Sequence, residues 1–238
     1  MSQRYSSIKG WAAAVGFLVA GLGVLLIAPI AAGAGSSGQL AIARAINLRA
    51  ADLPGFSPQP GGNSGANPFG SQINSTCSGL VGGGQHRGTA HAGSPLFMSK
   101  SGLLRSEEVQ SAVEIERSRR VVRHDLAVGR SKHTRVCIAA VLGTLKFNEH
   151  GTEVTLKNVR VTPLRVAIPG ADGAFGLHIH AAISALSLSI PFNIDMIGIA
   201  VGRDEISLLT EGIDRKLPRK TEQQLTQLLV SRALALPH

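Results

Sequence analysis

The spacing of apolar residues divides the chain into three parts. Residues 11–32 are almost entirely apolar and carry no charge, residues 54–102 are rich in Gly, Pro, Ser and Asn, and periodic patterns run from residue 109 onward. We therefore predict a leader at 1–34, a Gly/Pro-rich linker and loop segment at 35–102, and one domain at 103–238. Within the linker, residues 40–53 have a mixed pattern that fits a short helix or an edge strand.

The first half of the predicted domain combines one strand with two helices. Apolar and polar residues alternate over 109–116, which indicates a strand with one buried face. A helix over 118–128 would begin at Ser118 and stop at Gly129. Apolar residues at 138, 141, 142 and 145 have the i, i+3, i+4, i+7 spacing of a second helix.

Strands dominate the second half. Alternating or continuous apolar runs cover 154–161, 166–168, 175–183, 192–201 and 206–210, with turns between them and Pro163 at an edge or a break. A final helix has Thr221 and Gln224 in the spacing of a capping box, followed by the apolar stripe Leu225, Leu228, Leu229 and Ala233. The expected fold class is α+β, an antiparallel sheet backed by helices in two layers. Apolar residues of both parities over 183–199 exceed what one buried face needs, and this surplus would suit an apolar ligand or a partner.

The leader combines a basic start with an apolar core and a small-residue site. Arg4 and Lys9 precede the apolar run, and Ala32-Gly33-Ala34 has the small-x-small pattern that signal peptidase cleaves. Twenty-two apolar residues are also enough for a transmembrane anchor. Either a signal peptide or a membrane anchor places the rest of the chain outside the cytoplasm. We expect a protein of the cell envelope, secreted or held on the outer side of the cytoplasmic membrane.

The chain has two cysteines, Cys77 in the glycine-rich part and Cys137 in the second predicted helix. Outside the cytoplasm a lone pair of cysteines is expected to be oxidised. We predict a Cys77–Cys137 disulfide that holds the glycine-rich segment against a helix. The other readings are a buried free thiol and a catalytic pair of Cys137 with His133, four residues away.

Basic residues outnumber acidic ones by 24 to 15. Such a surface suits anionic lipid or an acidic envelope polymer, and export disfavours nucleic acid. Trp11 and Tyr5 lie in the leader, so the domain has only phenylalanine for stacking on bases. The residues proposed for contact with an anionic surface are Arg117, Arg119, Arg120, Arg123, Arg130, Lys132 and Arg135. Their positions scatter around the predicted helix, and a solvated helix face is the more common origin of such a run.

Short motifs give a loose resemblance to known proteins. They are the run from Ile46 to Phe56, a cysteine in the next segment, Ser94 to Phe97, and Val109–Glu116 leading into helices that carry Cys137. In this order of motifs the chain resembles exported and lipoprotein-like proteins of actinobacteria. These are similar in layout to the extracellular sensor domain of mycobacterial Ser/Thr kinases and to photosystem-subunit-P-like domains. The resemblance implies an antiparallel sheet with helices, a cleft, and a role in binding or sensing without catalysis.

His178 and His180 form the clearest candidate metal-binding motif in the sequence. On a strand the two side chains share a face, as ligands of a zinc site do, but the sequence identifies no third ligand; His86 and His91 are the other close pair. Two histidines on the wet face of a sheet are the simpler reading. The predicted function is a non-enzymatic extracytoplasmic binding or sensing module without a cofactor, whose partner is anionic lipid, envelope polymer or an apolar small ligand. The alternatives are a metal-dependent hydrolase that uses His178 and His180, and a basic structural envelope protein.

Overall fold

The computed structural model describes residues 37–59, 76–77, 88–102, 105–149, 152–185 and 188–236. The predicted leader at 1–34 lies outside these residues. None of the helices described here combines the length and the apolar character that crossing a membrane requires.

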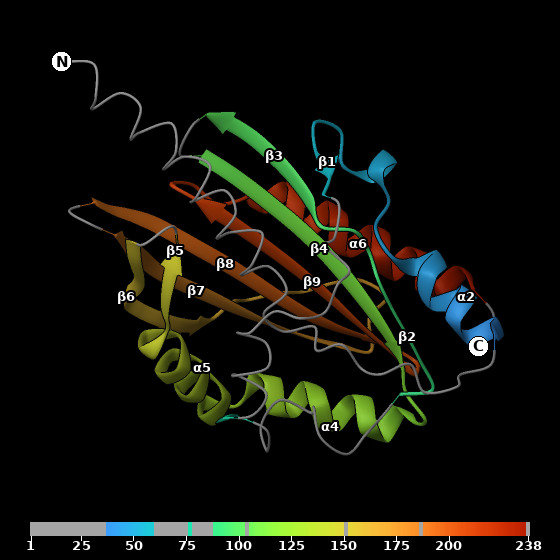
Figure 1. Cartoon of the computed structure of the whole chain (residues 1–238). Helices are drawn as coiled ribbons and strands as arrows, with labels where there is room; N and C mark the ends of the chain where they lie inside the picture. Colours follow the sequence, from blue (N-terminus) through green and yellow to red (C-terminus); the bar gives the residue numbers. More distant parts are fainter. Residues whose placement is uncertain are drawn as a thin grey trace.

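A single antiparallel sheet organises the described residues (Figure 1). Its order is β1-β3-β4-β9-β8-β7-β6-β5, and β2 also pairs with β4. The strands are β1 (Ser57–Pro58), β2 (Ala90–Gly93), β3 (Phe97–Gly102), β4 (Arg105–Ile115), β5 (Lys146–Glu149), β6 (Thr152–Pro163), β7 (Gly173–Ala185), β8 (Leu188–Val201) and β9 (Asp204–Ile213). The helices are α2 (Ser37–Ile46), α4 (Arg119–Arg130), α5 (Lys132–Thr144) and α6 (Arg219–Ala235), with a short 3-10 turn at Ala50–Asp52. The fold is α+β, as predicted.

Helices cover both faces of the sheet. Alternate residues of β8 belong to two separate cores: Phe192 and Ile194 pack with the apolar residues of α5, whereas Ile197 and Ile199 pack with those of α2 and α6. The expected two layers are therefore three, with the sheet between two helix pairs. The extra apolar residues of 183–199 are therefore explained by packing within the protein, because a strand buried on both faces needs apolar residues on both faces.

Strand β4 is also buried on both faces, although the sequence indicated one buried face. Val109 and Val113 are completely buried in the core on the α2/α6 side. Glu108 and Gln110, whose side chains point to the opposite face, are buried too, at 0% and 4% exposure. The polar residues that alternate along β4 therefore form a buried polar surface and do not face solvent.

Serine caps begin the two helices of the α4/α5 pair. The Val121 amide donates to Ser118 Oγ at 3.4 Å, which confirms the predicted cap. Helix α4 runs through Gly129 to Arg130 and does not stop at the glycine. The predicted capping box of the last helix is wrong, because α6 already begins at Arg219 and Thr221 lies in its first turn. Of the predicted apolar stripe of that helix, Leu225, Leu229 and Ala233 are buried and Leu228 is half-buried.

The segment expected to be a linker contributes α2 and three strands to the domain. The Asn47 amide donates to the Ala92 carbonyl at 2.8 Å and accepts from the Ser111 hydroxyl at 2.7 Å. Arg232 of α6 donates to both carboxylate oxygens of Asp52 at 2.8 Å. The folded domain therefore begins before residue 103. The glycine-rich stretches 60–75 and 78–87 lie outside the described residues.

The predicted disulfide is present. Cys77 is bonded to Cys137 of α5, with 6.1 Å between the Cα atoms. Cys77 is 1% exposed and belongs to the same core as Ile138 and Leu142. The bond ties Cys77 to α5 beside this core, and it is compatible with a location outside the cytoplasm.

Candidate functional site

The end of β6 leaves one edge of β7 uncovered. The two strands pair only from Leu177 of β7 onward, so Gly173–Gly176 has no β6 partner. After Pro163 the chain leaves the sheet as an extended segment, residues 164–169, which we call the strap. It stays attached through the Leu164 amide, which donates to the Gly176 carbonyl at 2.8 Å. Two backbone strands that separate in this way create space at the sheet edge.

A hollow of about 470 Å³ occupies this space, and we call it the edge groove. Its apolar lining comes from the strap and from β7 and includes Leu164, Val166, Phe175 and Leu177. Its polar lining is Gln223 of α6 and three arginines, Arg130, Arg135 and Arg165. The volume is in the range of small-molecule sites, and the mixture of an apolar surface with a few polar groups is typical of them.

Hydrogen bonds hold two of the three arginines at the junction of α4 and α5. Arg130 donates to the Ala174 carbonyl from Nε at 3.2 Å and from Nη2 at 2.7 Å. Arg135 donates from Nη1 to the Arg130 carbonyl at 2.7 Å. Each guanidinium has five donors in total, so both retain N–H groups for a ligand. The two positive charges are thus placed in advance on the helix side of the groove.

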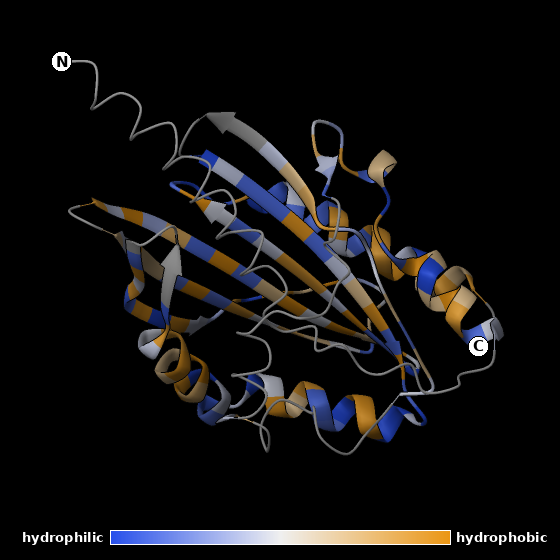
Figure 2. Cartoon of the chain, viewed as in Figure 1, coloured by the Kyte–Doolittle hydropathy of each residue, from blue (hydrophilic) through white to orange (hydrophobic). Residues whose placement is uncertain are grey.

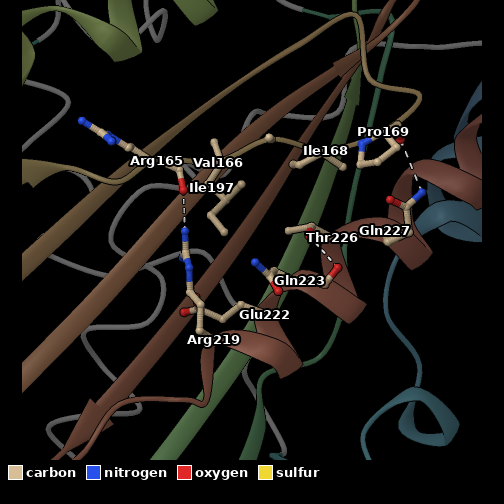
Figure 3. Close-up of a pocket in the computed structure, with 11 residues that line it drawn as sticks. Arg165, Val166, Ile168, Pro169, Ile197, Arg219, Glu222, Gln223, Thr226 and Gln227 are labelled. Carbon is tan, nitrogen blue, oxygen red and sulfur yellow. Dashed lines mark hydrogen bonds and ion pairs between the residues drawn. The ribbon is translucent and has the colours of Figure 1, made fainter.

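Arg165 supplies the third charge from the strap. Its backbone carbonyl accepts from Arg219 Nη2 of α6 at 2.6 Å, while its side chain points away from α6 (Figure 3). The lining of the edge groove contains no acidic residue. Three guanidinium groups without a carboxylate favour an anion, and their planar geometry suits a carboxylate or a phosphate.

Two glycines fix the aromatic ring of the groove. The Phe175 ring lies so close to Gly129 of α4 that a Cβ there would be 2.6 Å from it, and a Cβ at Gly198 of β8 would also collide with it. Phe175 therefore fits only because both neighbours lack side chains. The ring packs against Val122 and Leu126 of α4. A well-supported ring next to fixed cations is a preorganised surface.

On the other side of the strap lies a smaller crevice of about 220 Å³ (Figure 3). It is bounded by the strap and α6, with Ile197 of β8 between them. The Gln227 amide donates to the Pro169 carbonyl at 3.3 Å, near the opposite end of the strap from the Arg219 contact. Helix α6 therefore holds both ends of the strap and sets the position of Arg165.

A buried polar network connects this crevice to the sheet. His178 Nδ1 lies 2.5 Å from Asp195 Oδ1, and Thr210 Oγ1 donates to Glu222 at 2.9 Å. Burial and the nearby charge of Asp195 raise the pKa of Glu222. Burial alone would raise the pKa of Asp195, but hydrogen bonds from His178 and Glu222 outweigh it and lower that pKa. Glu222 also accepts from Arg219 at 2.8 Å, so the network orients the arginine that holds the strap.

The histidines singled out in the sequence share a face, as the alternation of β7 predicts. His178 contacts Asp195, and His180 Nδ1 lies 3.0 Å from Asn193 Oδ1, both on β8. His91 lies on β2, where burial lowers its pKa, and His86 is outside the described residues. The metal site on His178 and His180 stays a prediction.

Carboxylates gather at the far end of α4. Oxygens of Glu116, Asp125 and Glu205 lie within 4.8 Å of one another, which makes this group the one that could hold a cation among the described residues. Burial and neighbouring carboxylates raise the pKa of Glu205 to about 8, and burial with the charge of Glu116 raises that of Glu114 to about 8. Sequence analysis missed this cluster, because its members come from the residue after β4, from α4 and from β9, and meet only in the fold.

Six of the seven basic residues proposed for surface contact are exposed, and Arg135 is half-buried. In α4 the buried positions are Val122, Leu126 and Gly129; Arg119, Arg123 and Arg130 lie together along one exposed flank of that stripe, and Arg120 lies on the side opposite to it.

Comparison with protein-family models finds no match, and no curated protein matches the chain. The functional argument therefore rests on the geometry of the edge groove.

Proposed function

We propose that this protein is a non-enzymatic, extracytoplasmic binding module of the cell envelope, whose ligand is an anion with an apolar portion. The anionic group is a carboxylate or a phosphate, and the apolar portion is a hydrocarbon chain. The observation that carries the proposal is the lining of the edge groove: three arginines, no acid and an apolar surface around Phe175.

The chemistry of the lining supports this class of ligand over its neighbours. A purely apolar ligand would partly desolvate three guanidinium groups without offering them an opposite charge, which is costly. A small inorganic anion would leave the apolar surface of the strap and β7 unused. An amphiphilic anion satisfies both parts of the groove.

The leader pattern of the sequence and the disulfide support the extracytoplasmic setting of the proposal. The basic, apolar leader pattern and the Cys77–Cys137 disulfide both suit a protein that works outside the cytoplasm. Hydrocarbon chains with anionic heads are abundant there, as membrane lipids and as free fatty acids.

Isothermal titration of the full chain tests the proposal. The probes are dodecanoate and dodecyl phosphate, with dodecanol as the uncharged analogue and inorganic phosphate as the analogue without a chain. We expect the two charged amphiphiles to bind and both analogues to bind at least tenfold more weakly. Equal affinity for dodecanol would contradict the proposal.

Two variants and one control locate the site. Arg165→Gln removes the exposed strap charge, and the loss of a charged hydrogen bond should weaken binding by roughly 10-fold to 100-fold. Ala167→Trp fills the groove from the exposed side of the strap and should abolish binding. Arg160→Gln removes an equal charge from an exposed position on β6 outside the groove and should change little. If neither groove variant binds more weakly than the control, the ligand is not in the edge groove.

A further inference from the structure

The outward surface of α4 and α5 is built almost without acidic residues. Between Arg117 and Arg135 the chain has one acid, Asp125, and Asp125 is half-buried beside Glu116 and Glu205 behind the helix. Helix α5 contains no acid at all. The two helices follow each other along the same face of the sheet (Figure 1). Apart from Asp125, the charged residues from Arg119 of α4 to Arg135 of α5 are therefore basic, and the rest of α5 carries no charge.

Apolar residues continue this surface on α5. Lys132, Val136 and Ala140 follow each other at intervals of four and are exposed, with Val136 at 57%. Figure 2 shows the contrast between the hydrophilic bands of α4 and the largely apolar α5. Cations beside exposed apolar side chains are typical of helices that lie in a membrane interface.

The edge groove opens next to this surface. Arg130 and Arg135 line the groove and are also part of the basic surface. A ligand that leaves a layer of anionic lipid at α4 would therefore meet the groove through the same two guanidinium groups. This juxtaposition links the site to a source of its ligand.

We propose that the outward surface of α4 and α5 docks on an anionic lipid bilayer, which supplies the amphiphilic anion to the edge groove. The supply step rests on the proposed function, whereas the docking itself does not. An acidic polymer would satisfy the arginines equally well, but it would leave Val136 exposed to water. The apolar stripe of α5 thus favours the bilayer as the partner.

Energy transfer measures the docking directly. A fluorophore on Ala127→Cys, an exposed position of α4, reports its distance to acceptors on lipid headgroups. The full chain is mixed with vesicles of phosphatidylcholine alone or with added phosphatidylglycerol. The apolar N-terminal segment is common to all variants, so the difference between the two vesicle types isolates the charge-dependent contact. We expect docking only on the anionic vesicles, with a steep loss as salt rises.

A matched pair of triple variants decides whether α4 is responsible. Arg119→Gln/Arg120→Gln/Arg123→Gln should reduce docking by about 100-fold, since each cation near an anionic surface contributes about fivefold. The control Lys157→Gln/Arg160→Gln/Lys220→Gln removes the same charge from exposed positions on β6 and α6 and should change docking only a few-fold. Equal losses in both triples would overturn the proposal, as would an unchanged α4 triple. Docking on soluble polyphosphate but not on anionic vesicles would assign the surface to an acidic polymer.

Separate variants test ligand binding in the edge groove and docking of the helix surface. Arg165→Gln should still dock on anionic vesicles while it loses affinity for dodecanoate. The α4 triple should bind dodecanoate in solution with wild-type affinity. If the α4 triple loses soluble dodecanoate as well, the two sites are not independent and docking cannot be assigned to the helix surface.

Discussion

Replacing Glu205 by glutamine should stabilise the protein, and the gain should grow with pH. Glu205 lies beside Asp125, Glu114 and Glu116, and burial and these charges raise its pKa from 4.5 to about 8. The folded state therefore keeps a proton that the unfolded state has already released. Stability must fall as pH rises from 4.5 and level off above about 8.

The size of the gain follows from the pKa difference. At pH 7 the folded carboxyl group is still mainly protonated, so the difference from 4.5 corresponds to at most about 3 kcal/mol. Glutamine has no proton to lose and removes this penalty. We expect Glu205→Gln to match the wild type near pH 4.5 and to exceed it by up to about 3 kcal/mol at pH 7.

Urea unfolding between pH 4.5 and 9, with EDTA in every sample, measures this difference. Glu153→Gln is the control, because Glu153 is an exposed glutamate on β6 whose side chain is 62% accessible, and it should stay within about 0.5 kcal/mol of the wild type. A Glu205→Gln variant whose stability parallels that of the wild type at all pH values would refute the assignment of a raised pKa.

Three further changes test other parts of the fold. Asp52→Asn should lower the free energy of unfolding by about 2 kcal/mol, because it weakens the charged hydrogen bonds to α6. Those bonds outweigh burial and lower the pKa of Asp52. In acid unfolding the stability advantage of the wild type should therefore disappear as pH falls below 3.8. Reduction of the Cys77–Cys137 bond, which joins residues 60 positions apart, should lower the free energy of unfolding by about 4 kcal/mol. Urea unfolding with and without reductant measures this loss, and an unchanged midpoint would contradict the prediction. Gly198→Ala should lower the free energy of unfolding by about 1–3 kcal/mol, because the added methyl group collides with the Phe175 ring. In a double-mutant cycle, Gly198→Ala should destabilise a Phe175→Leu background less than it destabilises the wild type.

The regular elements were predictable because their signals are local. Alternation over 175–183 and helical spacing over 138–145 reflect which side chains meet a core, so β7 and α5 lie where the pattern places them. The number of layers was not predictable from one element at a time. Apolar residues of both parities in β8 fit a ligand surface as well as a second helix layer, and only the packing of α2 and α6 decides between them.

The features that could not be predicted from the sequence depend on contacts between residues that are distant in the chain. Asn47 bonds to Ser111, 64 residues away, and such a pairing is invisible in a glycine-rich segment that looks like a linker. Arg130 and Arg135 were singled out as surface cations, but their role in the groove depends on Arg165. That residue lines the same groove because β6 ends at Pro163 and β7 begins only at Gly173. The carboxylates around Glu205 likewise come from three elements.

Photo-crosslinking tests the central claim most directly, because it reports where the ligand lies. A dodecanoate carrying a diazirine on its chain is bound to the full chain, irradiated and mapped by mass spectrometry of the peptides. We predict labels on the strap and on the start of β7, within residues 163–167 and 174–177, that disappear with excess dodecanoate and in Ala167→Trp. Labels confined to other parts of the chain, or unchanged in Ala167→Trp, would contradict the assignment of the edge groove as the binding site.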